Sequence, residues 1–179
     1  MDVPIDLVPK ILKFVSNPAH LTSACPVNKT FYDFASPLLY RRIAFFSWTR
    51  NVKTRVTQLF TTLSNNARLA LFVQSLEIRN FPKHFSPDSP IIAVIPALKN
   101  CTNLRRLVWT RDGTLNSDIL QTLSSCAYLR ELEINGRHES NYDALLLLDF
   151  TKLESISIVM PSADLTTLLP SPNLGESEQ

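Results

Sequence analysis

Residues that could carry out acid–base, nucleophilic or metal chemistry are few in this chain and lie far apart. Catalysis needs such groups in a fixed constellation. No HExxH or GxSxG motif is present, and the 3 glycines of the 179 residues form no phosphate-binding loop. We therefore expect no enzyme, no metal site and no cofactor. The histidines and cysteines are His20, His84, His138, Cys25, Cys101 and Cys126.

One apolar pattern recurs five times and predicts a repeated structural unit. Each copy reads apolar-x-x-apolar-x-apolar, and the middle residues are 33, 31, 25 and 24 positions apart. These intervals approach the roughly 20 to 29 residues of leucine-rich repeats. The alternating end of each copy favours a short strand, and the residues before it have helical spacing. The copies are Tyr40/Ile43/Phe45, Val73/Leu76/Ile78, Leu104/Leu107/Trp109, Leu129/Leu132/Ile134 and Leu153/Ile156/Ile158.

These repeats predict an α/β fold in which residues 46–179 form a short, irregular leucine-rich-repeat solenoid, with parallel strands inside and helices outside. A further unit begins at Leu165, but the polar residues 175–179 stand where its strand should follow. We expect an array that is incomplete at the C-terminus, as in a fragment or a shortened product. A naturally short chain with a frayed polar end is the alternative.

Residues between the buried strand positions would line the open face of the sheet. Repeat proteins present such faces to partners, so we expect an unknown protein target to bind there. A basic patch on that target opposite Glu131 and Glu133 is one hypothesis, and acids that only solubilise the surface are the alternative. The predicted target-binding residues are Glu77, Arg79, Arg106, Val108, Thr110, Glu131, Glu133, Asn135, Ser155 and Ser157.

Charge is distributed unevenly along the chain. Residues 1–80 hold ten Lys/Arg and four Asp/Glu, a net +6, whereas residues 81–179 hold eight and twelve, a net −4. This asymmetry fits an acidic partner for the first half, and it fits a solvated surface equally well. No dense basic run alternates with aromatic residues, so nucleic acid is not an expected partner.

The sequence also predicts an intracellular protein of the cytoplasm or nucleus. Its first residues carry no basic region of a signal peptide, and its apolar runs are far shorter than the roughly 18 residues that span a bilayer. An odd number of cysteines without close pairs favours a reducing compartment. Cys101 and Cys126 occupy one repeat position, so we expect them to be buried thiols at a turn.

Residues 1–45 have a different pattern and predict a block of three short helices. Asp6 is a candidate cap for the first helix, whose first turn tolerates Pro9. Pro18 and Pro26 bracket the second helix. Asn28 is a candidate cap for the third, which we expect to end before Pro37.

The first helix has an unusually wide apolar face. At about 100° per residue, the apolar side chains between Ile5 and Val15 cover roughly 180° of its circumference, whereas a helix facing one core needs little more than about 100°. Apolar surface of this size must be covered by another group. That group is either a partner protein or the first repeat of the same chain.

The stretch from Val3 to about Arg42 resembles an F-box domain of the fungal type that runs directly into leucine-rich repeats. The resemblance lies in Pro4 followed by Asp6, in the apolar face of the first helix, and in residues 27–32, Val-Asn-Lys-Thr-Phe-Tyr. It implies docking onto the Skp-type adaptor of a cullin-RING (SCF) ubiquitin ligase. The adaptor-binding residues that it implies are Pro4, Leu7, Val8, Ile11, Leu12 and Val15.

These observations together predict the non-enzymatic substrate-recognition subunit of an SCF-type ubiquitin ligase, which acts in ubiquitin-dependent protein degradation. The helical block would bind the adaptor and the repeats would bind the target. The alternative is a leucine-rich-repeat interaction scaffold whose helical block only caps the solenoid. A hydrolase or metalloenzyme, the third reading, would require a bound metal or a reactive thiol.

Overall fold

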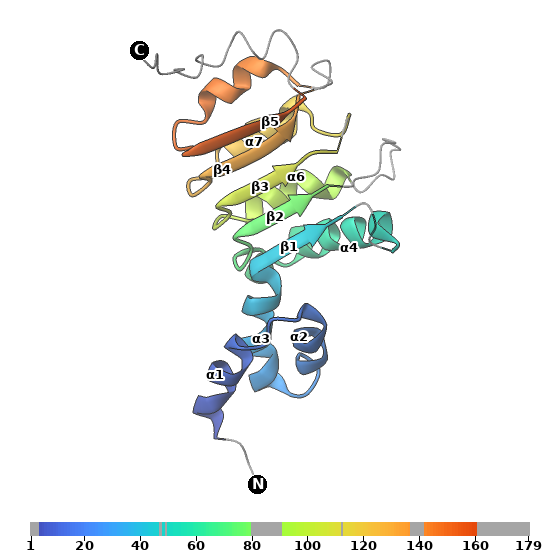
Figure 1. Cartoon of the computed structure of the whole chain (residues 1–179), viewed down its shortest axis with the longest axis vertical. Helices are drawn as coiled ribbons and strands as arrows, with labels where there is room; N and C mark the ends of the chain where they lie inside the picture. The colour runs from blue at the N-terminus through green and yellow to red at the C-terminus, as the bar shows by residue number, and fades with distance from the viewer. Residues whose placement is uncertain are drawn as a thin grey trace, which may run out of the picture.

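The computed structural model describes residues 4–46, 48, 50–79, 91–111, 113–136 and 142–160. Within them, an N-terminal helical domain is followed by a five-stranded sheet. Each successive strand lies farther from the helical domain (Figure 1). The unfinished unit predicted from Leu165 onward lies outside the described residues, as do His84 and His138.

The helical domain has a small core of its own. Its elements are η1 (Ile5–Leu7), α1 (Val8–Lys13), α2 (Pro18–Ala24) and α3 (Lys29–Arg41). Pro18 begins α2, as predicted, and the Asn17 side chain accepts a hydrogen bond from the Ala19 amide at 2.9 Å. Asn28 caps α3 by accepting from the Phe31 amide at 2.9 Å, which confirms that prediction. The buried apolar residues are Val8, Leu12, Leu21 and Ala35.

Two predictions about helix ends in this domain are wrong. Asp6 lies inside η1, and its side chain makes no capping hydrogen bond there or at α1. The third helix does not end before Pro37 but continues through it to Arg41. Leu38 and Leu39, which follow the proline, pack against the core of the helical domain. Their burial compensates for the backbone hydrogen bond that an internal proline removes.

The five predicted repeat triplets form neighbouring strands of one parallel sheet. Ile43, Leu76, Leu107, Leu132 and Ile156 are register partners from each strand to the next, which confirms the alignment read from the sequence. The strands lie in chain order, and the first of them begins at Arg42, inside the block predicted to be helical. They are β1 (Arg42–Phe45), β2 (Ser75–Ile78), β3 (Arg106–Trp109), β4 (Glu131–Asn135) and β5 (Ser155–Val159).

Helices cover one face of the sheet (Figure 1). α4, α6, α7 and η3 contact one another in that order, as a layer of connections between parallel strands requires. The core between the layers includes Phe60, Leu76, Leu107 and Trp109, all fully buried, and the Trp109 indole donates to the Thr114 hydroxyl at 2.9 Å. The connecting helices are α4 (Val52–Asn65), α5 (Ala67–Ala70), α6 (Ile91–Asn100), α7 (Ser117–Ser124) and η3 (Ala144–Asp149).

The helical domain and the sheet are joined by a continuous element. α3 ends at Arg41 and β1 begins at Arg42, with no loop between them. Two side-chain contacts brace this junction. Arg68 pairs with Asp33 of α3 at 2.8 Å, and the Arg41 guanidinium donates to the Gln74 side chain at 3.0 Å.

Candidate protein-binding surfaces

The first candidate surface is an apolar patch on η1 and α1, formed by Ile5, Leu7, Ile11 and Phe14. All four side chains are exposed, Ile11 to 54% and Phe14 to 89%. The opposite side of α1 carries Val8 and Leu12, which pack against Leu21 and Ala35. The helix therefore uses one part of its wide apolar face for its own core and leaves the other part in solvent.

The six predicted adaptor-binding residues divide between these two sides. Pro4, Leu7 and Ile11 are exposed and Val15 is half-buried. Val8 and Leu12 are only 3% and 4% exposed, so their side chains lie in the core of the helical domain and not on its surface. Ile5 and Phe14 lie on the exposed patch although the resemblance did not mark them. Phe14 follows Ile11 by three residues and Leu7 by seven, so helical spacing was a signal for it. No such spacing marks Ile5, which belongs to η1 and whose exposure is known from the structure alone.

The helical domain does not hide this apolar patch against the first repeat. Within the described residues, the main contacts of α1 are with η1 and α3, and the side chains of the patch remain exposed. This geometry favours coverage by another protein over the intramolecular alternative.

The second candidate surface is the strand face opposite the helices. Its charged side chains are paired with one another. Arg106 of β3 pairs with Glu131 of β4, and Arg79, just beyond β2, lies 3.3 Å from Glu133 and 3.5 Å from Glu77. Glu131 and Glu133 are therefore each already paired with an arginine of the same chain, which weakens the hypothesis of a basic patch on the target.

Val108 is the predicted target-binding residue that the structure excludes from this surface. It lies between Glu77 and Glu133 in the strand register and is 0% exposed. Arg79 contacts both of these glutamates, so the ion-paired side chains close over the valine. An apolar residue on the open face of a sheet is stable there because long charged side chains cover it with their aliphatic stems.

The other predicted residues of the strand face remain accessible to different extents. Ser155 and Ser157 on β5 are exposed, and Thr110 and Asn135 are half-buried. The Asn135 amide donates to the Thr110 carbonyl at 3.1 Å and so links the ends of two neighbouring strands, β3 and β4. The face as a whole is polar and held in place by contacts between adjacent strands.

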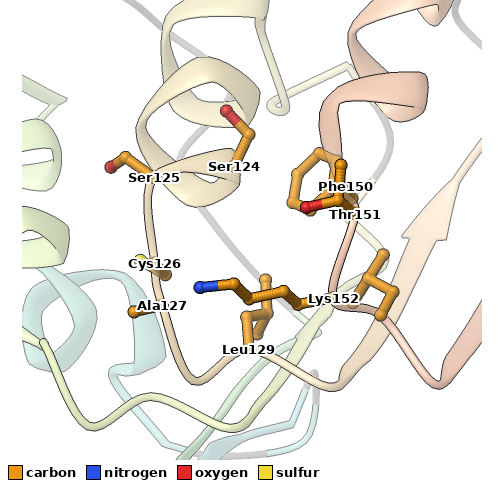
Figure 2. Close-up of a pocket in the computed structure, with 9 residues that line it drawn as sticks. Ser124, Ser125, Cys126, Ala127, Leu129, Phe150, Thr151 and Lys152 are labelled. Atoms are coloured by element: carbon orange, nitrogen blue, oxygen red, sulfur yellow. The ribbon is translucent and has the colours of Figure 1, made fainter.

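A cleft of about 200 Å³ between the end of α7 and the turn that precedes β5 brings together serine, cysteine and lysine side chains (Figure 2). The two hydroxyl groups already donate to carbonyls of α7, Ser124 to Gln121 at 2.9 Å and Ser125 to Thr122 at 2.6 Å. The Cys126 thiol likewise contacts the Thr122 carbonyl at 3.8 Å. These contacts satisfy the carbonyls at a helix end and do not form a catalytic arrangement.

Cys101 is fully buried, as predicted, whereas Cys126 is only half-buried. The Leu104 amide donates to the Cys101 carbonyl at 3.1 Å and the Leu129 amide to the Cys126 carbonyl at 3.2 Å, so the two turns are equivalent. Burial raises the pKa of the Cys101 thiol to about 12, and it also raises the pKa of Cys126. Both thiols stay protonated at neutral pH and are poor nucleophiles.

Two negative findings apply to the part of the chain that the structure describes. No cluster of three or more His, Cys, Asp or Glu side chains is placed to hold a metal ion. No described helix combines the length and the apolar character needed to cross a bilayer.

Residues 1–82 match the family model described as COS11 F-box domain. This range covers the helical domain, β1, α4, α5 and β2, and it ends before β3. A comparison with curated proteins gave no match. The first 82 residues, with the exposed patch on α1 at their beginning, therefore form an F-box domain.

Proposed function

We propose that this chain is the substrate-recognition subunit of an SCF-type cullin-RING ubiquitin ligase. The F-box domain docks a Skp-type adaptor through the apolar patch of η1 and α1. The sheet and its helices form a leucine-rich-repeat array that binds a target protein on its strand face. The chain performs no bond chemistry itself and serves to bring the target to the ligase.

The observation that carries this proposal is the exposure of Ile5, Leu7, Ile11 and Phe14 on a domain of F-box type. Burial of one large aliphatic or aromatic side chain stabilises a complex by roughly 1.5 to 3 kcal/mol. Four of them in one patch represent enough apolar surface to anchor a partner. General knowledge of F-box domains supplies the identity of that partner, the Skp-type adaptor.

The arrangement of the five strands supports a target-binding role for the second surface. Their register aligns side chains of five repeats in rows across one open face. The charges on that face are paired within the chain, so that a target would be recognised by shape and by hydrogen bonds to polar groups more than by net charge.

A co-expression experiment tests the adaptor-docking role. The chain is produced together with a Skp-type adaptor, and the complex is isolated by affinity capture and size-exclusion chromatography. The variant Leu7→Asp/Ile11→Asp places two carboxylates in the patch without touching the core, and we expect it to weaken the complex at least about tenfold. Leu12→Asp is unsuitable for this purpose because Leu12 is a core residue.

The matched control is Gln121→Asp, a new carboxylate at an exposed position of α7, which should leave adaptor binding unchanged. Circular dichroism of each variant checks that the fold is retained. An original chain that does not co-purify with the adaptor, or a double variant that binds it normally, would contradict the proposal and favour the simple interaction scaffold.

A further inference from the structure

The segment between Asp33 and Glu77 contains no acidic residue but six lysines and arginines. Arg68 is paired with Asp33, and Arg41 is hydrogen-bonded to Gln74. The other four cations have no ion pair with any described residue; they are Arg42 at the start of β1, Arg50, and Lys53 and Arg55 in the first turn of α4. Four cations without an ion pair to a described residue therefore lie within residues 42–55, the stretch that begins with β1.

β1 is also the first strand in the sheet order, with β2 on one side and no described strand on the other. The carbonyls of Arg41 and Phe45 face β2, because they accept hydrogen bonds from the Gln74 and Arg79 amides at 3.0 Å each. Backbone groups of successive strand residues point alternately to the two sides. The amide and carbonyl of Ala44 therefore face away from β2, along an edge that can accept another strand.

A cleft of about 350 Å³ runs beside this edge, between β1, the helical domain and α4. One side of β1 presents Ile43 and Phe45 to this cleft, together with apolar side chains of the neighbouring helices. The other side presents Arg42 and Ala44, which are exposed. The apolar residues from the helices are Leu39, Tyr40 and Leu59, and Arg55 lies at the same cleft.

We propose that the free edge of β1 binds an extended acidic segment of a partner protein, which adds to the sheet as a further strand. Side chains of a strand alternate between its two faces. A segment that alternates apolar and acidic residues would place the apolar ones over Ile43 and Phe45 and the acidic ones beside Arg42. Backbone hydrogen bonds to Ala44 would fix its position, as in other cases of strand addition.

This proposal goes beyond adaptor docking and uses different residues. The apolar patch on η1 and α1 carries none of the β1 edge residues. Arg42 borders the strand face beside Ser75 and Glu77, so it is the adaptor-docking proposal that strand addition leaves independent. Failure of strand addition would therefore leave the adaptor-docking proposal intact, and the reverse also holds.

The test measures binding of a short, end-blocked, fluorescently labelled peptide that alternates glutamate and valine, by fluorescence anisotropy with the full chain. A control peptide has the same composition, with all the glutamates in one block and all the valines in another. We expect the alternating peptide to bind at least about tenfold more tightly, because only its pattern suits both faces of β1. The affinity should fall as salt is added.

Two pairs of variants locate the site. Ala44→Pro removes the outward amide but no amide that faces β2, and Arg42→Glu reverses the nearest charge; each should weaken binding about tenfold or more. Ala44→Val keeps the amide, and Lys99→Glu makes the same charge change on α6. Both should bind within about twofold of the original chain, since neither variant changes the outward amide, Arg42, or the apolar side chains of Ile43 and Phe45.

Four outcomes would overturn the proposal. The first is no measurable binding of the alternating peptide to the original chain. The second is equal binding of the two peptides, and the third is tighter binding of duplex DNA of similar charge; either would show a non-specific polyanion site. The fourth is unchanged binding by both Ala44→Pro and Arg42→Glu. Because Arg42 is exposed, its variant remains informative even if Ala44→Pro is poorly folded.

Discussion

The helical domain and the sheet treat their surfaces in opposite ways. The helical domain buries few side chains and leaves large apolar ones on α1 in solvent. The sheet buries a long apolar core and pairs the charges of its open face with one another. Large apolar side chains left in solvent indicate that a partner is apolar at the contact. Charges that are already paired within the chain give no such indication. The proposed partner of the apolar patch is therefore easier to identify than the proposed partner of the strand face.

The largest change in the free energy of unfolding should distinguish two neighbouring residues on opposite sides of α1. Leu12→Asp places a carboxylate in the core of the helical domain and should lower the free energy of unfolding by at least about 3 kcal/mol. Ile11→Asp, one position away, should change it by less than about 1 kcal/mol because that side chain is already in water. Chemical denaturation followed by far-ultraviolet circular dichroism measures both values. Equal destabilisation by the two variants would remove the distinction between core and patch.

A smaller effect is expected on the strand face. Arg79→Ala leaves Glu77 and Glu133 on either side of Val108 with no cation between them. We expect a loss of about 1 kcal/mol in unfolding free energy, part of which returns in the double variant Arg79→Ala/Glu133→Ala because the like-charge repulsion is then removed. Urea denaturation at low and high salt measures these losses. An Arg79→Ala variant as stable as the original chain would show that the face does not depend on this ion pairing.

The smallest effect concerns Cys101 and is confined to alkaline pH. Its pKa is raised from 9.0 to about 12 in the folded chain. The contribution of this thiol to the free energy of unfolding is fully present below pH 9. It is lost as the pH rises through about 12, because the unfolded chain gives up the proton first. The difference in unfolding free energy between the original chain and Cys101→Ala should therefore shrink from pH 9 to pH 12. Cys25→Ala is the control, and a constant difference for Cys101→Ala would contradict the assignment.

The sheet could be predicted from the sequence to the level of its register. Leu76, Leu107 and Leu132 recur in one pattern, and each is buried opposite the next. Such agreement is possible because the side-chain period of a strand is two, so a slip of one residue would expose every one of these leucines. The repeats therefore specify their own alignment, whatever the length of the segments between them.

Other features depend on contacts that a linear pattern does not contain. Val108 reads as an exposed position, but it is fully buried between Glu77 and Glu133. Arg79, which follows β2, pairs with both of these glutamates. The end of α3 depends on packing that outweighs the effect of Pro37. On α1, the pattern predicted an excess of apolar surface but not which residues form it, because the choice between Val8 and Leu7 is made by the position of α2 and α3.

The absence of a loop between α3 and β1 has a consequence for the geometry of any assembly. A residue added to an α-helix advances the following segment by 1.5 Å and turns it by about 100°. The number of residues in α3 therefore sets the orientation of the sheet about the helix axis, relative to the helical domain. A protein bound to that sheet would be held at one orientation and one distance from the helical domain. Insertion of a single residue into α3 would rotate the bound protein to a different side of the assembly.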